Sequence, residues 1–102
     1  MEVLIVKENE NLIRNISVSG VKEILGSDKY TQRVIMPKAG YRLCVLYNPD
    51  AKGKKRKIKL HSGEIITLRG TYIIVREEYG AYSNIGLDDI GDVMLAMEDK
   101  RG

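Results

Sequence analysis

The sequence predicts one α+β domain, in which a mostly antiparallel sheet of about five to seven strands packs with two helices. The 102 residues are a usual length for one domain, and 43% apolar with 30% charged residues is typical of a folded globular chain. Several short β-branched segments are separated by turn residues, whereas two segments carry apolar residues at helical spacing. We therefore expect a single compact domain over residues 1–102.

The N-terminal part predicts two strands, a helix and a third strand. Residues 2–7 are apolar toward both faces, which predicts a central strand covered on both sides, and residues 12–17 predict a weaker second strand. A short helix is expected to start at Ser19-Gly20 and to stop at Gly26. Residues 30–36 have strand composition, and Pro37 is expected to end that strand.

The rest of the chain predicts more strands and a closing helix. Residues 41–47 alternate between two faces, as a strand does. Further strands are expected at residues 55–60, 64–68 and 71–77, with a hairpin at residues 79–83. The apolar stripe of a C-terminal amphipathic helix is formed by Leu87, Ile90, Val93, Met94 and Met97. Asp88 and Asp89 fall in its first turn, where the helix dipole favours negative charge.

The net charge of +3 is unevenly distributed along the chain. Residues 49–76 carry eight basic and two acidic side chains, whereas residues 77–102 carry two and seven. Most of the excess comes from a basic run, made of Lys52, Lys54, Lys55, Arg56, Lys57 and Lys59. Its first half follows a turn and is expected to be a loop. Its second half alternates, which would put Lys55, Lys57 and Lys59 on one solvent-facing side of a strand.

Features that the sequence lacks indicate where the protein resides and which kinds of chemistry it does not support. The longest apolar stretch, residues 3–6, is too short to span a membrane, and the N-terminus lacks the basic start of a secretory signal, so we expect a cytoplasmic protein. Cys44 has no partner for an internal disulfide and is expected to be buried. Cys44 and His61 are a candidate catalytic pair, and Asp88, Asp89 and Asp92 are a candidate cation site; each set also has an ordinary structural role.

The structural roles are favoured, because one Cys and one His do not make the usual zinc ligand set and acidic residues are common in a first helical turn. No phosphate-binding glycine-rich loop is present. We expect no enzymatic activity, no metal and no cofactor.

The basic run has three competing interpretations. It is either a solvated loop that protects an edge strand, a site for a phosphate-bearing ligand, or a docking site for an acidic protein surface. Lysine and arginine gain affinity for phosphates by releasing counterions. Tyrosine rings stack on nucleobases, and Tyr41, Tyr47 and Tyr72 are the candidates for that role.

The order of motifs resembles a family of small domains from phages, plasmids and other bacterial mobile elements. The likeness rests on the opening strand at residues 3–8, the helix at residues 21–25, the strand at residues 70–75 and the Ser83…Leu87-Asp88-Asp89-Ile90 segment. The family has no agreed active-site residues to carry over. The sequence departs from the family at residues 50–61, where relatives have a shorter and less basic connection.

The resemblance implies a bacterial host and an accessory protein that acts by binding. The leading hypothesis is a counter-defence inhibitor, which either sequesters a nucleotide signal or docks on a host defence effector. A net positive chain is unsuited to mimicking DNA. Because 102 residues leave little room for a deep private cavity, such a pocket would be shared in a homo-oligomer. The alternative is a nucleic-acid-binding module that uses the basic run along a phosphate backbone.

Overall fold

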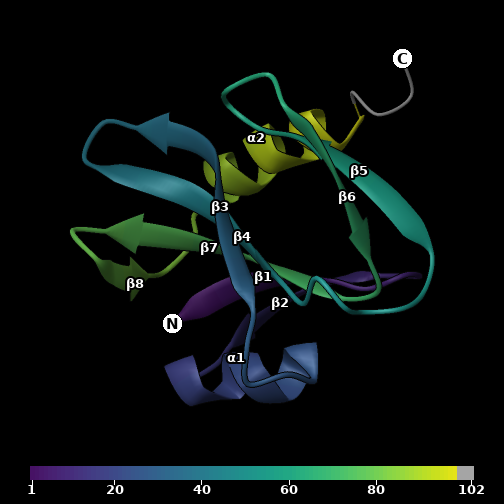
Figure 1. The fold of residues 1–102 in the computed structure, drawn as a ribbon. Coiled ribbons are helices and arrows are strands. Elements are labelled where there is room, and N and C mark those ends of the chain that lie inside the picture. Colours follow the sequence, from purple (N-terminus) through teal and green to yellow (C-terminus); the bar gives the residue numbers. More distant parts are fainter. Residues whose placement is uncertain (99–102) are drawn as a thin grey trace.

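The computed structural model describes residues 1–98, which form eight strands and two helices (Figure 1). The strands are β1 (Glu2–Val6), β2 (Asn11–Asn15), β3 (Thr31–Lys38), β4 (Tyr41–Tyr47), β5 (Lys55–Lys59), β6 (Ile65–Arg69), β7 (Tyr72–Glu78) and β8 (Ala81–Ser83). The helices are α1 (Val18–Leu25) and α2 (Leu87–Glu98). The α+β class, the antiparallel pairing, the helix after the second strand and the C-terminal helix are confirmed. No helix within these residues is long and apolar enough to cross a membrane.

The main sheet has the order β2-β1-β7-β4-β3, and β8 pairs with β7 beyond the end of β1. β4 and β7 are neighbours in this sheet, with Tyr47 opposite Tyr72. Between those two tyrosines the chain leaves the sheet and forms the separate two-stranded β5–β6 ribbon. The ribbon is therefore an excursion from a continuous β4–β7 pair.

Three layers result, because both faces of the main sheet are apolar and both are covered (Figure 1). α1 covers one face, where Val21 and Leu25 pack with Val3 and Ile5 of β1. The ribbon and α2 cover the other face. This arrangement confirms the expected strand covered on both sides, which ends at Val6, one residue before the predicted end at Lys7.

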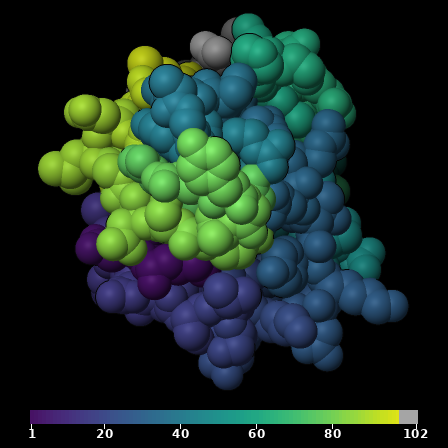
Figure 2. Space-filling view, turned by 90° about the vertical axis from the view of Figure 1, so that its left-hand side faces the viewer, coloured from purple at the N-terminus to yellow at the C-terminus, as the bar shows by residue number. Residues whose placement is uncertain are grey.

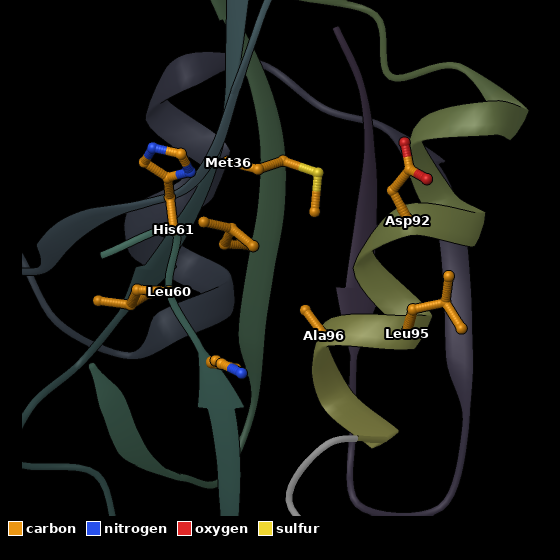
Figure 3. Close-up of a pocket in the computed structure, with 8 residues that line it drawn as sticks. Met36, Leu60, His61, Asp92, Leu95 and Ala96 are labelled. Carbon is orange, nitrogen blue, oxygen red and sulfur yellow. The ribbon is translucent and has the colours of Figure 1, made fainter. Parts of the chain in front are cut away.

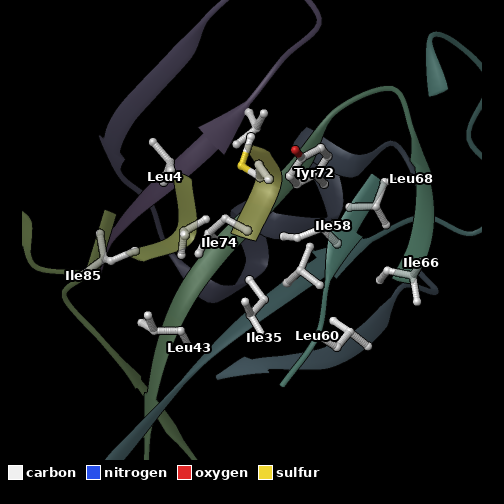
Figure 4. Close-up of a cluster of buried hydrophobic side chains, with 14 residues drawn as sticks. Leu4, Ile35, Leu43, Ile58, Leu60, Ile66, Leu68, Tyr72, Ile74 and Ile85 are labelled. Atoms are coloured by element: carbon white, nitrogen blue, oxygen red, sulfur yellow. The ribbon is translucent and has the colours of Figure 1, made fainter. Parts of the chain in front are cut away.

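The larger core cluster lies between the main sheet and the second covering layer (Figure 4). The ribbon contributes Ile58, Leu60, Ile66 and Leu68, all at most 9% exposed. Fully burying one such side chain contributes about 1.5–3 kcal/mol. The ribbon is consequently held to the sheet by its inward face, which leaves its outward face available to solvent.

Helix α1 begins earlier than Ser19-Gly20. Ser17 is its N-cap: the backbone there is extended at φ −84°, and the Ser17 Oγ accepts a hydrogen bond from the Gly20 N–H at 3.2 Å. The end at Gly26 is as predicted, with a left-handed φ of 69° and its N–H donating to the Lys22 carbonyl. Ser17 and Ser19 are both residue types that cap helices, and the structure has Ser17 in that position.

Strand β3 continues through Pro37, so the prediction that Pro37 ends it is wrong. Pro37 stands opposite Arg42, after a register irregularity between Val34 and Met36. β3 is an edge strand of the sheet, and proline is tolerated on edges because its missing N–H removes no bond to an outer neighbour.

Helix α2 packs on the sheet as expected, with Val93 and Met97 buried and Ile90 and Met94 half-buried. Leu87 is the exception, because its side chain is 80% exposed. At 100° per residue it lies about 70° round the helix from the centre of the other four apolar residues. It therefore belongs to the flank of the helix and not to the core stripe.

Candidate phosphate-binding site

The β5–β6 ribbon separates its apolar and basic side chains onto two faces. Ile58 points inward, whereas Lys55 and Lys57 are exposed, as the alternation predicted. On β6, Thr67 and Arg69 share the exposed face, and the register sets Arg69 directly opposite Lys55. Like charges facing each other across a strand pair are destabilising, so an anion between them would relieve a repulsion built into the fold.

A concave surface of about 580 Å³ lies beside this exposed face. We name it the basic pocket, and its lining residues are Tyr47, Asn48, Pro49, Lys55, Lys57, Thr67 and Arg69. Three of these side chains are cationic and none is acidic. The Tyr47 side chain, half-buried at the end of β4, supplies an aromatic surface to the pocket.

The Asn48 turn holds the pocket wall in place. The Asn48 Oδ1 accepts a hydrogen bond from the Asp50 N–H at 2.9 Å, and its Nδ2 donates to the Leu25 carbonyl at 3.5 Å. Both ends of the amide are thus engaged within the protein. Asn48 positions the wall, and the hydrogen-bond donors that remain in the pocket lining are the Lys55, Lys57 and Arg69 side chains and the Thr67 hydroxyl.

A second contact fixes the connection that leads into β5. The Glu8 Oε1 accepts a hydrogen bond from the Lys54 N–H at 2.9 Å. A Cβ on Gly53 would lie 2.5 Å from that same oxygen and 3.3 Å from the backbone of Gly70. Glycine at both positions lets the Gly53 and Gly70 backbones lie close together where the connection passes the start of β7.

The pocket cations lack ion-pair partners in the described part of the chain. The ion pairs found there join Arg33 with Glu64, Lys38 with Asp92, Arg42 with Glu77, and Arg76 with Glu78 and Asp89. None of them involves Lys55, Lys57 or Arg69. The positive charge of the pocket is therefore not neutralised by any acidic side chain in the described part of the chain.

The structure divides the predicted basic run among several places. Lys52 and Lys54 are exposed in the β4–β5 connection and do not line the basic pocket. Lys59 lines a different cavity. Arg56 points inward: its guanidinium carbon lies 5.7 Å from the centre of the Tyr72 ring. Its Nε and one Nη are buried without a hydrogen-bond partner among the described atoms. Arg56 therefore does not share the exposed face with Lys55 and Lys57.

Of the three tyrosines proposed for base stacking, only Tyr47 lies at the basic pocket. Tyr72 is 1% exposed, and burial raises the pKa of its phenol, so the prediction that its ring stacks on a base is wrong. Tyr41 lies at the other end of β4, where it lines a hollow between the β3–β4 and β7–β8 hairpins. Figure 2 shows these two hairpins next to each other on one face of the molecule. Its hydroxyl donates to the Asp89 Oδ1 at 2.7 Å, and the Arg76 guanidinium carbon lies 3.7 Å from the centre of its ring.

A cavity of about 460 Å³ separates α2 from β3 and the β5–β6 turn. Met36, Leu60 and His61 lie on one side of it, and Asp92, Leu95 and Ala96 of α2 lie on the other (Figure 3). Lys59 is the one lysine among the described residues of its lining. The mixed apolar and charged lining gives no concentration of donors for an anion.

The residues weighed for catalysis or metal binding are not brought together. Cys44 is fully buried on the α1 side of the sheet, where burial raises the pKa of its thiol to about 11, whereas His61 is exposed beside the ribbon turn. Asp89 is bonded to Tyr41, and Asp92 pairs with Lys38. No cluster of three or more metal-ligating side chains occurs within the described residues.

Sequence reasoning missed Thr67 and Arg69 on β6 as well as the Asn48-Pro49 wall. The alternation of residues 65–69 does place Thr67 and Arg69 on one face. Their position beside Lys55 and Lys57 depends on the β5–β6 register, which the sequence pattern does not specify. Comparison of the chain with family models, with curated proteins and with solved structures found no match.

Proposed function

We propose that this protein acts by binding, without catalysis, and that it holds a phosphate-bearing ligand in the basic pocket. The observation that carries the proposal is the convergence of Lys55, Lys57 and Arg69 on one concave surface whose lining contains no acidic residue. The opposed Lys55 and Arg69 repel each other in the free protein. Phosphate oxygens accept hydrogen bonds from all three side chains, and the release of counterions adds to the affinity.

The ligand that fits best is a nucleotide. Its phosphates would lie between the ribbon cations, and its base would lie against Tyr47, which is the aromatic side chain of the pocket. The biological role we attach to this is counter-defence in a bacterial host, in which the protein sequesters a nucleotide signal. That role is supported by the resemblance to mobile-element proteins described above.

A second candidate is single-stranded nucleic acid lying along the ribbon. It is favoured by the continuation of exposed cations beyond the pocket, to Lys59 at the end of β5 and to Lys52 and Lys54 in the connection. A backbone-binding protein would use all of these charges, whereas a nucleotide would use only those of the pocket.

The experiment compares two double variants from the same basic run. Binding of fluorescent cyclic dinucleotides and of a labelled single-stranded oligonucleotide is measured by anisotropy for wild type, Lys55→Gln/Lys57→Gln and Lys52→Gln/Lys54→Gln. For a nucleotide pocket we expect at least a tenfold loss of dinucleotide affinity in the first variant and less than a twofold change in the second.

The other outcomes also decide the matter. Equal losses of oligonucleotide affinity in both variants, with a steep fall of affinity at rising salt, would replace the nucleotide by a nucleic-acid backbone. If wild type binds neither probe at low salt, or if the Lys55→Gln/Lys57→Gln variant binds as wild type does, the basic pocket is not a phosphate site.

A further inference from the structure

Strand β2 has an open edge whose backbone groups point away from the sheet. It pairs with β1 from Val6↔Asn11 to Glu2↔Asn15, and no described strand lies on its other side. The ladder is bonded at both ends, by the Lys7 N–H to the Glu10 carbonyl at 2.8 Å and by the Ile16 N–H to the Met1 carbonyl at 2.9 Å.

Backbone bonding alternates along an antiparallel strand pair, so the two end bonds show for each residue of β2 whether its backbone groups face β1 or the open edge. Leu12 and Arg14 exchange bonds with β1, so the N–H and C=O groups of Asn11, Ile13 and Asn15 point to the open edge. Among these groups, the Ile13 carbonyl accepts a hydrogen bond from the Arg14 Nη1 at 3.0 Å. A carbonyl oxygen has a second lone pair, so this contact leaves Ile13 able to accept another bond.

The two edge strands of the main sheet, β3 and β2, differ in how readily they could pair with another strand. β3, at the far edge, carries Pro37 and an irregular register, which are features that obstruct pairing with another strand. β2 has no proline, and its pairing with β1 is regular. Ile13, at its centre, is 42% exposed. An open, regular edge with an exposed isoleucine is a site for strand addition.

We propose that β2 pairs antiparallel with β2 of a second copy of this chain, about a two-fold axis that passes through Ile13. The segment Asn11-Leu-Ile-Arg-Asn15 suits this symmetry, because Ile13 then faces Ile13 of the other copy and Asn11 faces its Asn15. The outward backbone groups of Asn11, Ile13 and Asn15 fall into bonded pairs in this register. The isoleucines and the asparagine amides make matched cross-strand neighbours.

Charge supports the same register. Glu10, Leu12 and Arg14 share one face of the strand, and both charged side chains are exposed and outside any ion pair of the described residues. Within one chain they are about 13 Å apart along the strand, too far to pair. Across the two-fold axis each Arg14 faces Leu12 of the other copy and lies diagonal to both its Glu10 and its Arg14. Two Glu10–Arg14 attractions therefore outnumber one Arg14–Arg14 repulsion.

The proposal is tested by measuring the mass in solution by sedimentation at increasing protein concentration. Two variants that each reverse one charge, at Arg14 or at Glu10, are then measured separately and as a mixture. Wild type is expected to rise from 11.5 kDa toward about twice that mass. Arg14→Glu and Glu10→Arg each turn the two attractive diagonals into repulsive ones, so that all three diagonals join like charges and each variant alone stays a monomer. Mixing the two variants restores the dimer, because every diagonal then joins opposite charges.

An exposed isoleucine elsewhere provides the matched control. Ile13→Lys should abolish the dimer by setting two lysines face to face. Ile65→Lys, on the ribbon at a side chain 53% exposed, should leave the dimer unchanged. Circular dichroism checks that each variant is folded. A wild type that is monomeric at every concentration overturns the proposal, as does a dimer that persists in both Arg14→Glu and Ile13→Lys.

Discussion

Arg42 and Glu77 stand directly opposite each other on β4 and β7, and the Arg42 Nε donates a hydrogen bond to the Glu77 Oε1 at 2.9 Å. The other carboxylate oxygen of Glu77 accepts a hydrogen bond from the Gln32 Nε2 at 3.0 Å. These two side chains hold the pKa of Glu77 below its usual value of 4.5, with the Arg42 bond as the larger cause. The pair links the stability of the sheet to pH.

We predict that Glu77 makes the protein less stable in acid. Because its pKa is lowered in the folded state, its stabilisation is present above pH 4.5 and is lost as the pH falls through the folded value. Urea unfolding between about pH 6 and about pH 3 should therefore show a shallower loss of stability for Glu77→Gln than for wild type. Glu23→Gln, on the exposed side of α1, serves as the control and should retain the wild-type slope.

We predict that Asp89 fixes the start of α2. Its side chain is buried, and it accepts hydrogen bonds from the Gly86 N–H at 3.0 Å and from the Tyr41 hydroxyl at 2.7 Å. Asp89→Ala leaves both donors unpaired and should lower the free energy of unfolding by about 1–3 kcal/mol. The neighbouring Asp88→Ala, at an exposed residue, should cost less than about 1 kcal/mol by removing a dipole interaction. Equal losses in urea unfolding would argue against a role for these bonds.

Cys44 should be inert in the folded protein. Burial raises the pKa of its thiol to about 11, so the thiolate is scarce at neutral pH and the sulfur is inaccessible. We expect no reaction with Ellman's reagent at about pH 8 until urea unfolds the chain, and then one thiol per chain. Labelling of the native protein at the rate of a free cysteine would show that the α1 layer opens readily.

The close approach at Gly53 should be measurable against a glycine that has space. Gly53 and Gly63 both have positive φ angles, of 136° and 92°, but a Cβ on Gly63 would meet nothing within 4 Å. Gly63→Ala therefore reports backbone strain alone, about 1 kcal/mol. Gly53→Ala also sets a methyl group against the Gly70 backbone and displaces the Glu8 carboxylate from its bond to the Lys54 N–H, so it should destabilise the protein more. Similar unfolding midpoints for the two variants would contradict this packing.

Much of the fold is predictable because its signals are local. The alternation of residues 55–60 places Lys55 and Lys57 outward, and the continuous apolar segments at residues 3–6 and 72–75 indicate strands covered on both faces. The second of these segments also contains the signal that Tyr72 is buried. Tyr72 was a candidate for base stacking because of its ring, whereas its β-branched neighbours indicate burial.

The remaining features depend on tertiary position. Pro37 is tolerated because β3 lies at an edge of the sheet. The order of the strands in the sheet cannot be inferred from the residues of any one strand. Arg69 joins the basic pocket only through the register that sets it opposite Lys55. The pocket was therefore only half predictable: its lysines came from the basic run, but the side chains facing them came from a strand whose partner was unknown.

The pairing of Tyr47 with Tyr72 gives the ribbon a distinctive evolutionary freedom. The chain departs from the sheet and returns to it at a single crossing point, so residues 48–71 can vary in length and charge without rethreading any other strand. The constraint on such variation is the inward quartet Ile58, Leu60, Ile66 and Leu68, which must still cover the sheet. The outer surface of the ribbon, including the basic pocket, can thus change while the sheet beneath it keeps its strand order.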